Sequence, residues 1–171
     1  MLRITSGRLE LKARAVAREG DVVKTDFRQP NVFDRTVNRA FGFFLKLGIG
    51  LRHNYLLEVH GRKTGRVHST PVNLIEFKDR KYLVAPRGYT QWVRNVEASG
   101  EATLVRGARC ERVRLRAIAD EMKPEILKAY LDRFKLTVQR YFPISAGSPP
   151  EALRPLSANY PVFEVSDGAK P

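Results

Sequence analysis

The sequence is poor in the residues that build disulfides, metal sites and membrane spans. Cys110 is the only cysteine in 171 residues, so no disulfide can form within the chain, which suits a reducing cytoplasm. Three histidines and one cysteine form no metal-ligand pattern, so we expect no metal site. The only long apolar run, residues 40–51, is interrupted by glycines and a lysine and is too short to span a bilayer. The N-terminus lacks a signal-peptide pattern, and we expect a cytoplasmic protein.

Acidic residues are also scarce. The chain has 18 Asp and Glu residues and 31 Lys and Arg residues. The resulting net charge of +13 attracts anions over a distance. Nucleic acid, anionic lipid and an acidic cofactor would all satisfy that charge. No motif of a nucleic-acid-binding domain is present, and the aromatic residues lie in apolar runs rather than among the arginines, so we expect no nucleic-acid partner. Peripheral membrane contact through the N-terminal region stays open.

The chain divides into a basic N-terminal arm and one domain. Residues 1–30 are polar and weakly patterned, with a short helix expected at residues 8–18. The remainder, residues 31–171, is long enough to form a single domain with a substantial core. It opens with an amphipathic helix pattern at residues 32–47, whose apolar face is compatible with core packing or with membrane contact.

Short strands dominate the rest of the domain. The clearest lies at residues 110–117, where Arg112 and Arg114 alternate with Val113 and Leu115, as expected of a strand with one wet and one buried face. Further strands are expected at residues 55–60, 71–77, 81–85, 102–106 and 161–165. Consecutive short strands with few helices predict a mainly β fold of the α+β class, built as an antiparallel barrel or a strongly bent sheet.

Helices and one loop interrupt these strands. Thr90 is a suitable N-cap for a helix at residues 91–98, and Pro124 suits the first turn of another. The Pro-, Gly- and Ser-rich residues 143–150 predict an ordered loop or lid.

The most informative segment, residues 61–71, reads Gly-Arg-Lys-Thr-Gly-Arg-Val-His-Ser-Thr-Pro. Glycines expose main-chain N–H groups that can surround an anion, and the basic side chains add charge-assisted hydrogen bonds. The spacing matches neither a P-loop nor a dinucleotide-binding fingerprint. By itself the segment is compatible with an anion site or with a solvated hairpin tip.

A second segment, residues 85–95, runs from the end of a strand through Gly88 into the short helix. The N–H groups at such a helix start can bind an anion or a carbonyl oxygen. Trp92 and Asn95 lie one turn apart on this helix. Trp92 is equally suited to anchor the helix on the barrel.

Together, the two segments resemble the deazaflavin (F420)-dependent nitroreductase family, which are split-β-barrel flavin/deazaflavin oxidoreductases related to actinobacterial F420H2-dependent quinone reductases. The resemblance covers residues 40–120 and extends more weakly to residue 165. It implies a six- to seven-stranded antiparallel split β-barrel with peripheral helices. It also implies coenzyme F420 as the ligand, whose phosphodiester and glutamate carboxylates would account for the positive charge of the chain.

The resemblance further implies where the cofactor binds. The basic loop meets the phosphate and the glutamyl tail, the residues after it lie along the cofactor near the ring, and the second segment contacts the ring edge. The cofactor-binding residues carried over by position are Arg62, Lys63, Thr64, Arg66, His68, Ser69, Thr70, Pro71, Arg87, Gly88, Gln91, Trp92 and Asn95. His68 departs from the family pattern, because many relatives have arginine there, and the segment before Trp92 is shorter than in many relatives.

The activity that the resemblance implies is hydride transfer from F420H2 to a small electron-poor acceptor such as a quinone, nitroarene or enone. Tyr141 and Tyr89 are the candidate catalytic residues, as donors to the oxygen on which negative charge develops. Two alternatives remain: a split-barrel protein that binds FMN, FAD or heme, and a non-enzymatic carrier of a fatty acid or another anionic ligand. A homodimer is compatible with the sequence.

Overall fold

The computed structural model describes residues 53–168. The predicted N-terminal arm, residues 1–30, and the predicted helix at residues 32–47 therefore lie outside the described residues. Within residues 53–168, no helix is long and apolar enough to cross a membrane.

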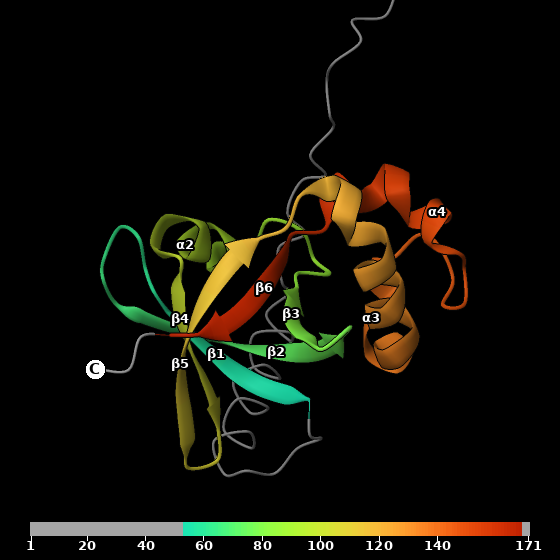
Figure 1. The fold of residues 1–171 in the computed structure, drawn as a ribbon. Helices are drawn as coiled ribbons and strands as arrows, with labels where there is room; N and C mark the ends of the chain where they lie inside the picture. The colour runs from blue at the N-terminus through green and yellow to red at the C-terminus, as the bar shows by residue number, and fades with distance from the viewer. Residues whose placement is uncertain (1–52, 169–171) are drawn as a thin grey trace, which may run out of the picture.

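Six antiparallel strands form a closed barrel in the order β1-β2-β3-β6-β5-β4 (Figure 1). The strands are β1 (Asn54–His60), β2 (Val67–Phe77), β3 (Arg80–Val84), β4 (Glu101–Arg106), β5 (Arg109–Ala117) and β6 (Val162–Asp167). The predicted antiparallel barrel is confirmed, and all six expected strands are present.

Local sequence explains two features of the second strand. Lys78 and Asp79, with φ of 49° and 59°, connect β2 to β3 in the left-handed conformation that tight hairpins require. Pro71 lies within β2 opposite Leu56 of β1, whereas pairing of β2 with β3 begins only at Leu74. The edge of β2 that faces β3 is thus unpaired at Pro71, which is where a strand tolerates a residue without an N–H group.

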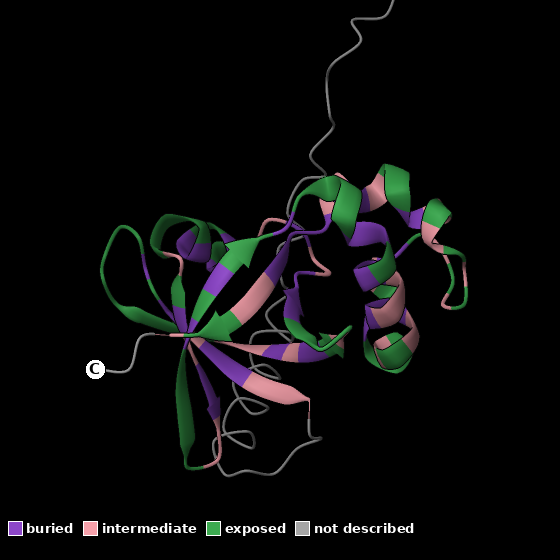
Figure 2. Cartoon of the chain, viewed as in Figure 1, coloured by how far each residue is buried: buried purple, intermediate pink, exposed green. Residues whose placement is uncertain are grey.

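The barrel interior is filled by alternate residues of all six strands. Leu57 and Leu83 are fully buried there, and Phe163 is 2% exposed. On β5, Val113 and Leu115 are buried while the intervening arginines are exposed, so the predicted alternation is confirmed (Figure 2). This interior gives the site a rigid wall.

Helix α2 (Gln91–Ser99) connects β3 to β4 and buries one face against the barrel interior. It starts after Thr90 and ends at Gly100, which adopts a left-handed conformation with φ of 69°. Trp92, Val93 and Val96 belong to the same apolar cluster as the strand residues. The start of α2 is therefore fixed relative to the ends of the strands.

A second apolar cluster lies outside the barrel, between β2, β3 and the helices that follow β5. Figure 1 shows α3 and α4 together on one side of the barrel, apart from α2. The helical elements are η1 (Asp120–Met122), α3 (Lys123–Val138), η2 (Gln139–Tyr141), α4 (Pro150–Leu153) and η3 (Arg154–Asn159). Tyr130 of α3 is fully buried in this cluster, and burial raises the pKa of its hydroxyl.

Two leucines, one fully buried and one almost fully exposed, provide a test of the barrel core. Leu83 is 0% exposed inside the barrel, and Leu136 is 95% exposed on α3. We expect Leu83→Ala to lower the free energy of unfolding by about 2–5 kcal/mol because it leaves a cavity. Leu136→Ala should change it by less than about 0.5 kcal/mol. Urea unfolding followed by circular dichroism measures both, and equal effects would contradict this core.

Candidate cofactor site

The basic segment forms the hairpin tip between β1 and β2. The Gly61 N–H donates to the Arg66 carbonyl at 2.8 Å, and the Gly65 N–H donates to the Gly61 carbonyl at 2.7 Å. Gly65 has φ of 66°, which favours glycine at this position. The tip spans residues 61–66, and residues 67–70, expected before the strand at residues 71–77, already belong to β2. These residues pair with β1, starting at the pair of His60 with Val67, which explains why β2 is longer than expected.

Arg62 fastens this hairpin tip to α2. Its Nη1 donates to Gln91 Oε1 at 3.1 Å and to Asn95 Oδ1 at 3.0 Å. Its main-chain N–H also donates to Asn95 Oδ1, at 3.3 Å. Asn95 is 4% exposed, so its amide oxygen depends on these donors. Because both acceptors are neutral amides, the positive charge of Arg62 is not cancelled.

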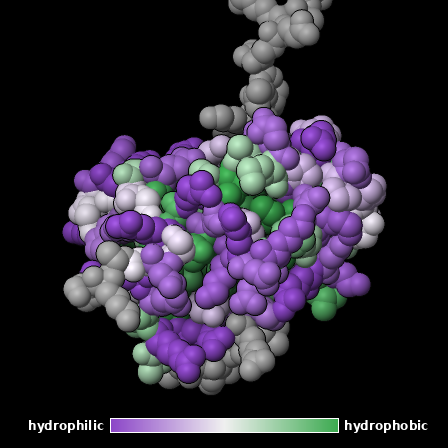
Figure 3. Space-filling view, viewed as in Figure 1, coloured by the Kyte–Doolittle hydropathy of each residue, from purple (hydrophilic) through white to green (hydrophobic). Residues whose placement is uncertain are grey.

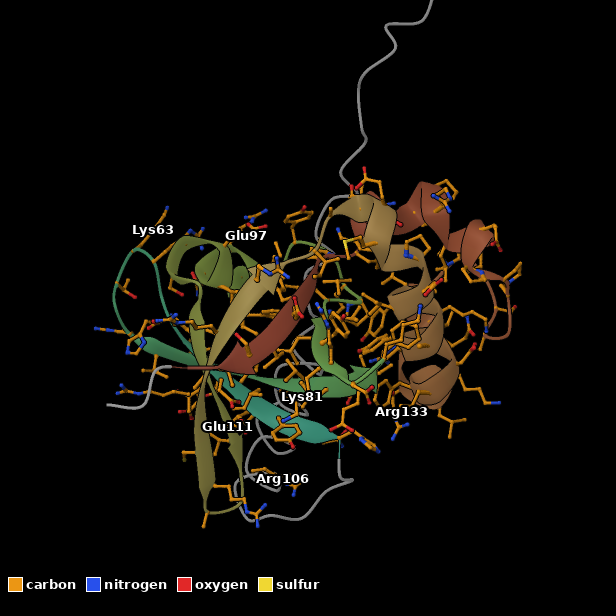
Figure 4. The ribbon with its side chains drawn as sticks, in the orientation of Figure 1. Lys63, Lys81, Glu97, Arg106, Glu111 and Arg133 are labelled. Atoms are coloured by element: carbon orange, nitrogen blue, oxygen red, sulfur yellow. The ribbon has the colours of Figure 1, made fainter. Side chains whose placement is uncertain are left out.

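Lys63 and Arg66 add two exposed cations to the same tip. Neither makes an ion pair with a carboxylate of residues 53–168. Figure 4 shows Lys63 on the hairpin with its side chain directed away from the barrel. Thr64 is the third exposed residue of the turn, and its hydroxyl accepts a weak hydrogen bond from the Arg66 N–H at 3.4 Å. The tip therefore presents three cations without an acidic neighbour in its own sequence.

The first residues of β2 continue from the tip. The His68 ring lies close to Gly61, where a Cβ would stand 2.9 Å from His68 Nε2. Ser69 donates to Glu58 Oε1 at 3.3 Å across the β1–β2 pair. Thr70 and Pro71 are half-buried. Pairing of β2 with β3 begins at Leu74, so Ser69, Thr70 and Pro71 all lie along the edge of β2 that is not paired with β3.

The second segment makes a tight turn before α2. The Gly88 N–H donates to the Ala85 carbonyl at 3.0 Å, and Gly88 has φ of 74°. This geometry favours glycine and brings the chain from the end of β3 into the helix start. The Gly88 N–H is used within the turn, and the Gly88 carbonyl accepts a hydrogen bond from the Thr90 N–H at 2.8 Å.

Thr90 has the backbone conformation of an N-cap but does not cap the helix with its side chain. Its φ and ψ are −72° and 174°, and no hydrogen bond joins its hydroxyl to α2. Its Oγ1 is buried and has no hydrogen-bond partner among the described residues. We did not predict Thr90 as a site residue, because sequence gives its capping preference and not the direction of its hydroxyl.

Trp92, expected beside the cofactor, lies mainly in the barrel core. It is 8% exposed and packs against Phe163 with ring centroids 5.7 Å apart. Its side chain therefore anchors α2. Asn95, one turn later, contacts the hairpin through Arg62 as described above.

The two candidate tyrosines lie in different surroundings. The Tyr141 ring stands 5.9 Å from the Arg87 guanidinium and 4.8 Å from that of Arg140. The Arg140 Nη2 donates to the Tyr141 hydroxyl at 2.6 Å, and the Tyr160 hydroxyl donates to the Tyr141 carbonyl at 2.8 Å. Tyr89 is half-buried, and its pKa is raised by desolvation and then by the charges of Glu97 and Asp120. Tyr89 therefore stays protonated beyond the usual range.

The predicted loop at residues 143–150 is ordered by two side chains of the preceding helical segment. Gln139 donates to the Ile144 carbonyl at 2.8 Å and accepts from the Ala146 N–H at 2.9 Å. Asp132 accepts from the Gly147 N–H at 2.6 Å. Lys128 and the Gly147 N–H lower the pKa of Asp132. These contacts describe a loop held against α3.

The structure thus brings two groups of predicted residues together. The hairpin tip meets α2 through Arg62, Gln91 and Asn95, and the turn before α2 meets the end of the α3 segment through Arg87 and Tyr141. No group of His, Cys, Asp and Glu side chains in residues 53–168 has the arrangement of a metal site.

The candidate site thus consists of a cationic hairpin that contacts a helix start at the end of an antiparallel barrel. Residues 32–140 match the family described as F420H(2)-dependent quinone reductase. The match covers more than half of the 171 residues, so the chain belongs to this family of F420-dependent oxidoreductases. No curated protein matches the chain.

Several solved structures are similar at low sequence identity. An F420-H2 dependent reductase, FDR-A, is 18% identical over 67% of this chain and 95% of its own, with a TM-score of 0.46. HutZ, a heme storage protein from Vibrio cholerae, is 8% identical over 70% and 84%, with a TM-score of 0.49. An FAD-binding protein from Mesorhizobium loti is 11% identical over 84% and 94%, with a TM-score of 0.46. At these identities and scores they carry no functional argument.

The contact between Arg62 and Asn95 can be tested against a matched arginine. Arg62→Ala should lower the free energy of unfolding by about 1–2 kcal/mol, because the buried Asn95 amide loses its charged donor. Arg94→Ala removes an equal charge from the exposed face of α2 and should change stability by less than about 0.5 kcal/mol. Urea unfolding compares the two variants, and an equal loss from both would rule out a structural role for Arg62.

Proposed function

We propose that this protein binds F420H2 between the hairpin tip and the start of α2, and reduces a small electron-poor acceptor by hydride transfer. The observation that carries the proposal is the charge of the tip. Arg62 is held against two neutral amide oxygens, and Lys63 and Arg66 are exposed beside it without carboxylate partners among the described residues. Such a cluster suits a ligand with several negative charges.

The residues present fit coenzyme F420 in their donor chemistry. Its phosphodiester and glutamate carboxylates need cations and N–H donors, which the hairpin tip supplies through Lys63, Arg66 and Thr64. The free face of the Arg62 guanidinium adds a planar donor group. His68 adds a cation only when protonated, and Arg66 provides the permanent charge.

The ring of the cofactor and the acceptor need an apolar surface. Figure 3 shows apolar side chains in the middle of one face, framed by hydrophilic residues, between the barrel with α2 and the α3–α4 side. A flat acceptor such as a quinone, a nitroarene or an enone can stack on a ring placed there. Alignment of the two reacting atoms is the main catalytic contribution that the protein makes.

When bound, reduced F420 supplies the hydride. The acceptor oxygen then gains negative charge and needs a hydrogen-bond donor. Tyr141 can serve, because its oxygen accepts from Arg140 and its own hydrogen has no acceptor among the described residues. Tyr89 can serve over a wide pH range, because its raised pKa keeps it protonated. Both tyrosines are proposed donors, with Tyr141 the first choice.

We extend the proposal to the organisation of the protein. Residues 31–171 would form the cofactor-binding domain and residues 1–30 an arm outside it. A cytoplasmic location and peripheral membrane contact through the basic N-terminal region belong to the same proposal and are supported by the composition of the sequence, and a homodimer is compatible with it.

Direct titration tests the choice of ligand. We expect oxidised F420 to quench the fluorescence of Trp92, the only tryptophan, in a saturable manner, since Trp92 lies at the start of α2. FMN, FAD, heme and a fatty acid are titrated in parallel. Saturation by F420 and turnover of F420H2 with a quinone support the proposal. Saturable binding of FMN alone would overturn the deazaflavin assignment, and binding of the fatty acid alone would favour a carrier.

Removal of the tip cations tests the placement of the cofactor. Lys63→Ala with Arg66→Ala should weaken F420 binding at least about tenfold, or about 1.4 kcal/mol. The double variant Arg112→Ala with Arg114→Ala removes the same charge from the exposed face of β5 and should change affinity by less than about threefold at 0.15 M salt, where distant charges are screened. Equal loss in both variants would mean that net charge, and not the tip, governs binding.

A further inference from the structure

We infer that residues 32–47 pack with their apolar side on the outer face of the barrel, over Leu56 of β1 and Val105 of β4. The sequence pattern of this segment is compatible with core packing or with membrane contact. The outer face of the barrel decides between the two, and it does so independently of the cofactor and of the proposed function.

A row of four side chains crosses this outer face. Leu56 lies directly opposite Pro71 of β2 on one side and Val105 of β4 on the other. Val105 in turn lies opposite Cys110 of β5. Directly opposed residues point to the same face of a sheet, and the adjacent Leu57 points into the barrel, so these four residues form an outward-facing row. With strands about 4.8 Å apart, the outer row is about 14 Å long.

The two central residues of the outer row are almost fully buried although they point outward. Leu56 is 3% exposed and Val105 is 6% exposed. Neither belongs to the apolar cluster inside the barrel or to the cluster between the barrel and α3. Pro71 and Cys110 are too short to cover two branched side chains, and Cys110 is itself exposed. An apolar partner beyond both clusters therefore covers this row.

The segment that precedes β1 has the pattern, length and attachment of such a partner. Its large apolar residues recur at helical spacing on one side, and these are Phe33, Val37, Phe41, Phe44 and Leu45. A helix over residues 32–47 would be about 24 Å long, which is enough to cross the outer row. Residues 48–52 can span up to about 17 Å, so the end of that helix can reach Leu56 without strain.

The neighbouring part of the outer face is covered in the same manner. Ile75 of β2 and Tyr82 of β3 lie opposite each other and belong to the cluster beneath α3. A helix over Leu56 and Val105 would extend this helical layer around the barrel. The family match begins at residue 32, which places the segment within the matched domain rather than in the preceding arm.

A second copy of the chain fits this face less well. The burial of Leu56 and Val105 is a property of one chain by itself, so it requires neither a second copy nor lipid. Exposed Arg112 and Arg114 follow Cys110 on β5, and two chains with a net charge of +13 would repel each other there. Four side chains also fall far short of the roughly 20–30 residues a side that a stable interface uses.

Hydrogen exchange of the full-length protein, resolved by mass spectrometry, tests the docking. We expect residues 32–47 to be protected in buffer without lipid, because a lone helix of this length is marginal in water and needs packing. Val105→Ser weakens the outer row and should speed exchange of this segment at least about tenfold, while β3 and β6 keep their protection. Val67→Ser, at a position of β2 that is 52% exposed, should leave the exchange unchanged.

Cys110 provides a second readout, because it is the only cysteine and lies at the exposed end of the outer row. Val37→Cys and Phe41→Cys are each treated with a short bismaleimide. At least one of them should form a cross-link to Cys110 within a single chain, identified by peptide mass. Arg39→Cys lies on the opposite side of the helical pattern and should give little of this product.

Three results would overturn the inference. Residues 32–47 that exchange as fast in wild type as in Val105→Ser would not be the occupant of the outer row. Protection that appears only with phosphatidylglycerol vesicles would make the segment a membrane contact. Cross-links between two chains, in place of those within one chain, would assign the face to a second copy.

Discussion

The docking of the hairpin tip on α2 through the buried amide of Asn95 is the contact on which the proposed site depends. The tip and the helix are separated by about thirty residues in sequence, and only the closed barrel brings the end of β1 near the connection between β3 and β4. Asn95 offers one oxygen to both the main chain and the side chain of Arg62. Because Asn95 is nearly inaccessible to water, the position of the tip is tied to the position of the core.

The chemical character of that contact matters as much as its geometry. Glu164 on β6 pairs with Arg116 and Arg80, and these arginines lower the pKa of its carboxyl, so their charges are compensated on the barrel wall. Arg62 is held instead by amide oxygens, which orient a guanidinium without neutralising it. The tip therefore retains its attraction for an anion. Repulsion among the three cations lowers the stability of the free protein, and a multiply charged ligand would relieve that repulsion on binding.

Strong local patterns predicted much of the fold. The alternation on β5 and the helix that follows Thr90 were each predicted from residues close in sequence, and each is present. Pairing between distant segments was harder to anticipate. The start of β2 at Val67 depends on its pairing with His60, and a basic turn followed by hydroxyl residues gives no local sign of a strand. The contact between Arg62 and Asn95 depends on the whole barrel.

His68 shows how a departure from the family pattern can be accommodated. Its ring lies against Gly61, so the imidazole packs on the tip. A longer arginine at position 68 would reach past the tip and add a cation, whereas the histidine leaves that task to Arg66 and Lys63. The cations of the proposed anion site therefore lie in the turn rather than on the strand. In the proposed site, the hairpin geometry at Gly61 and Gly65 positions the turn cations.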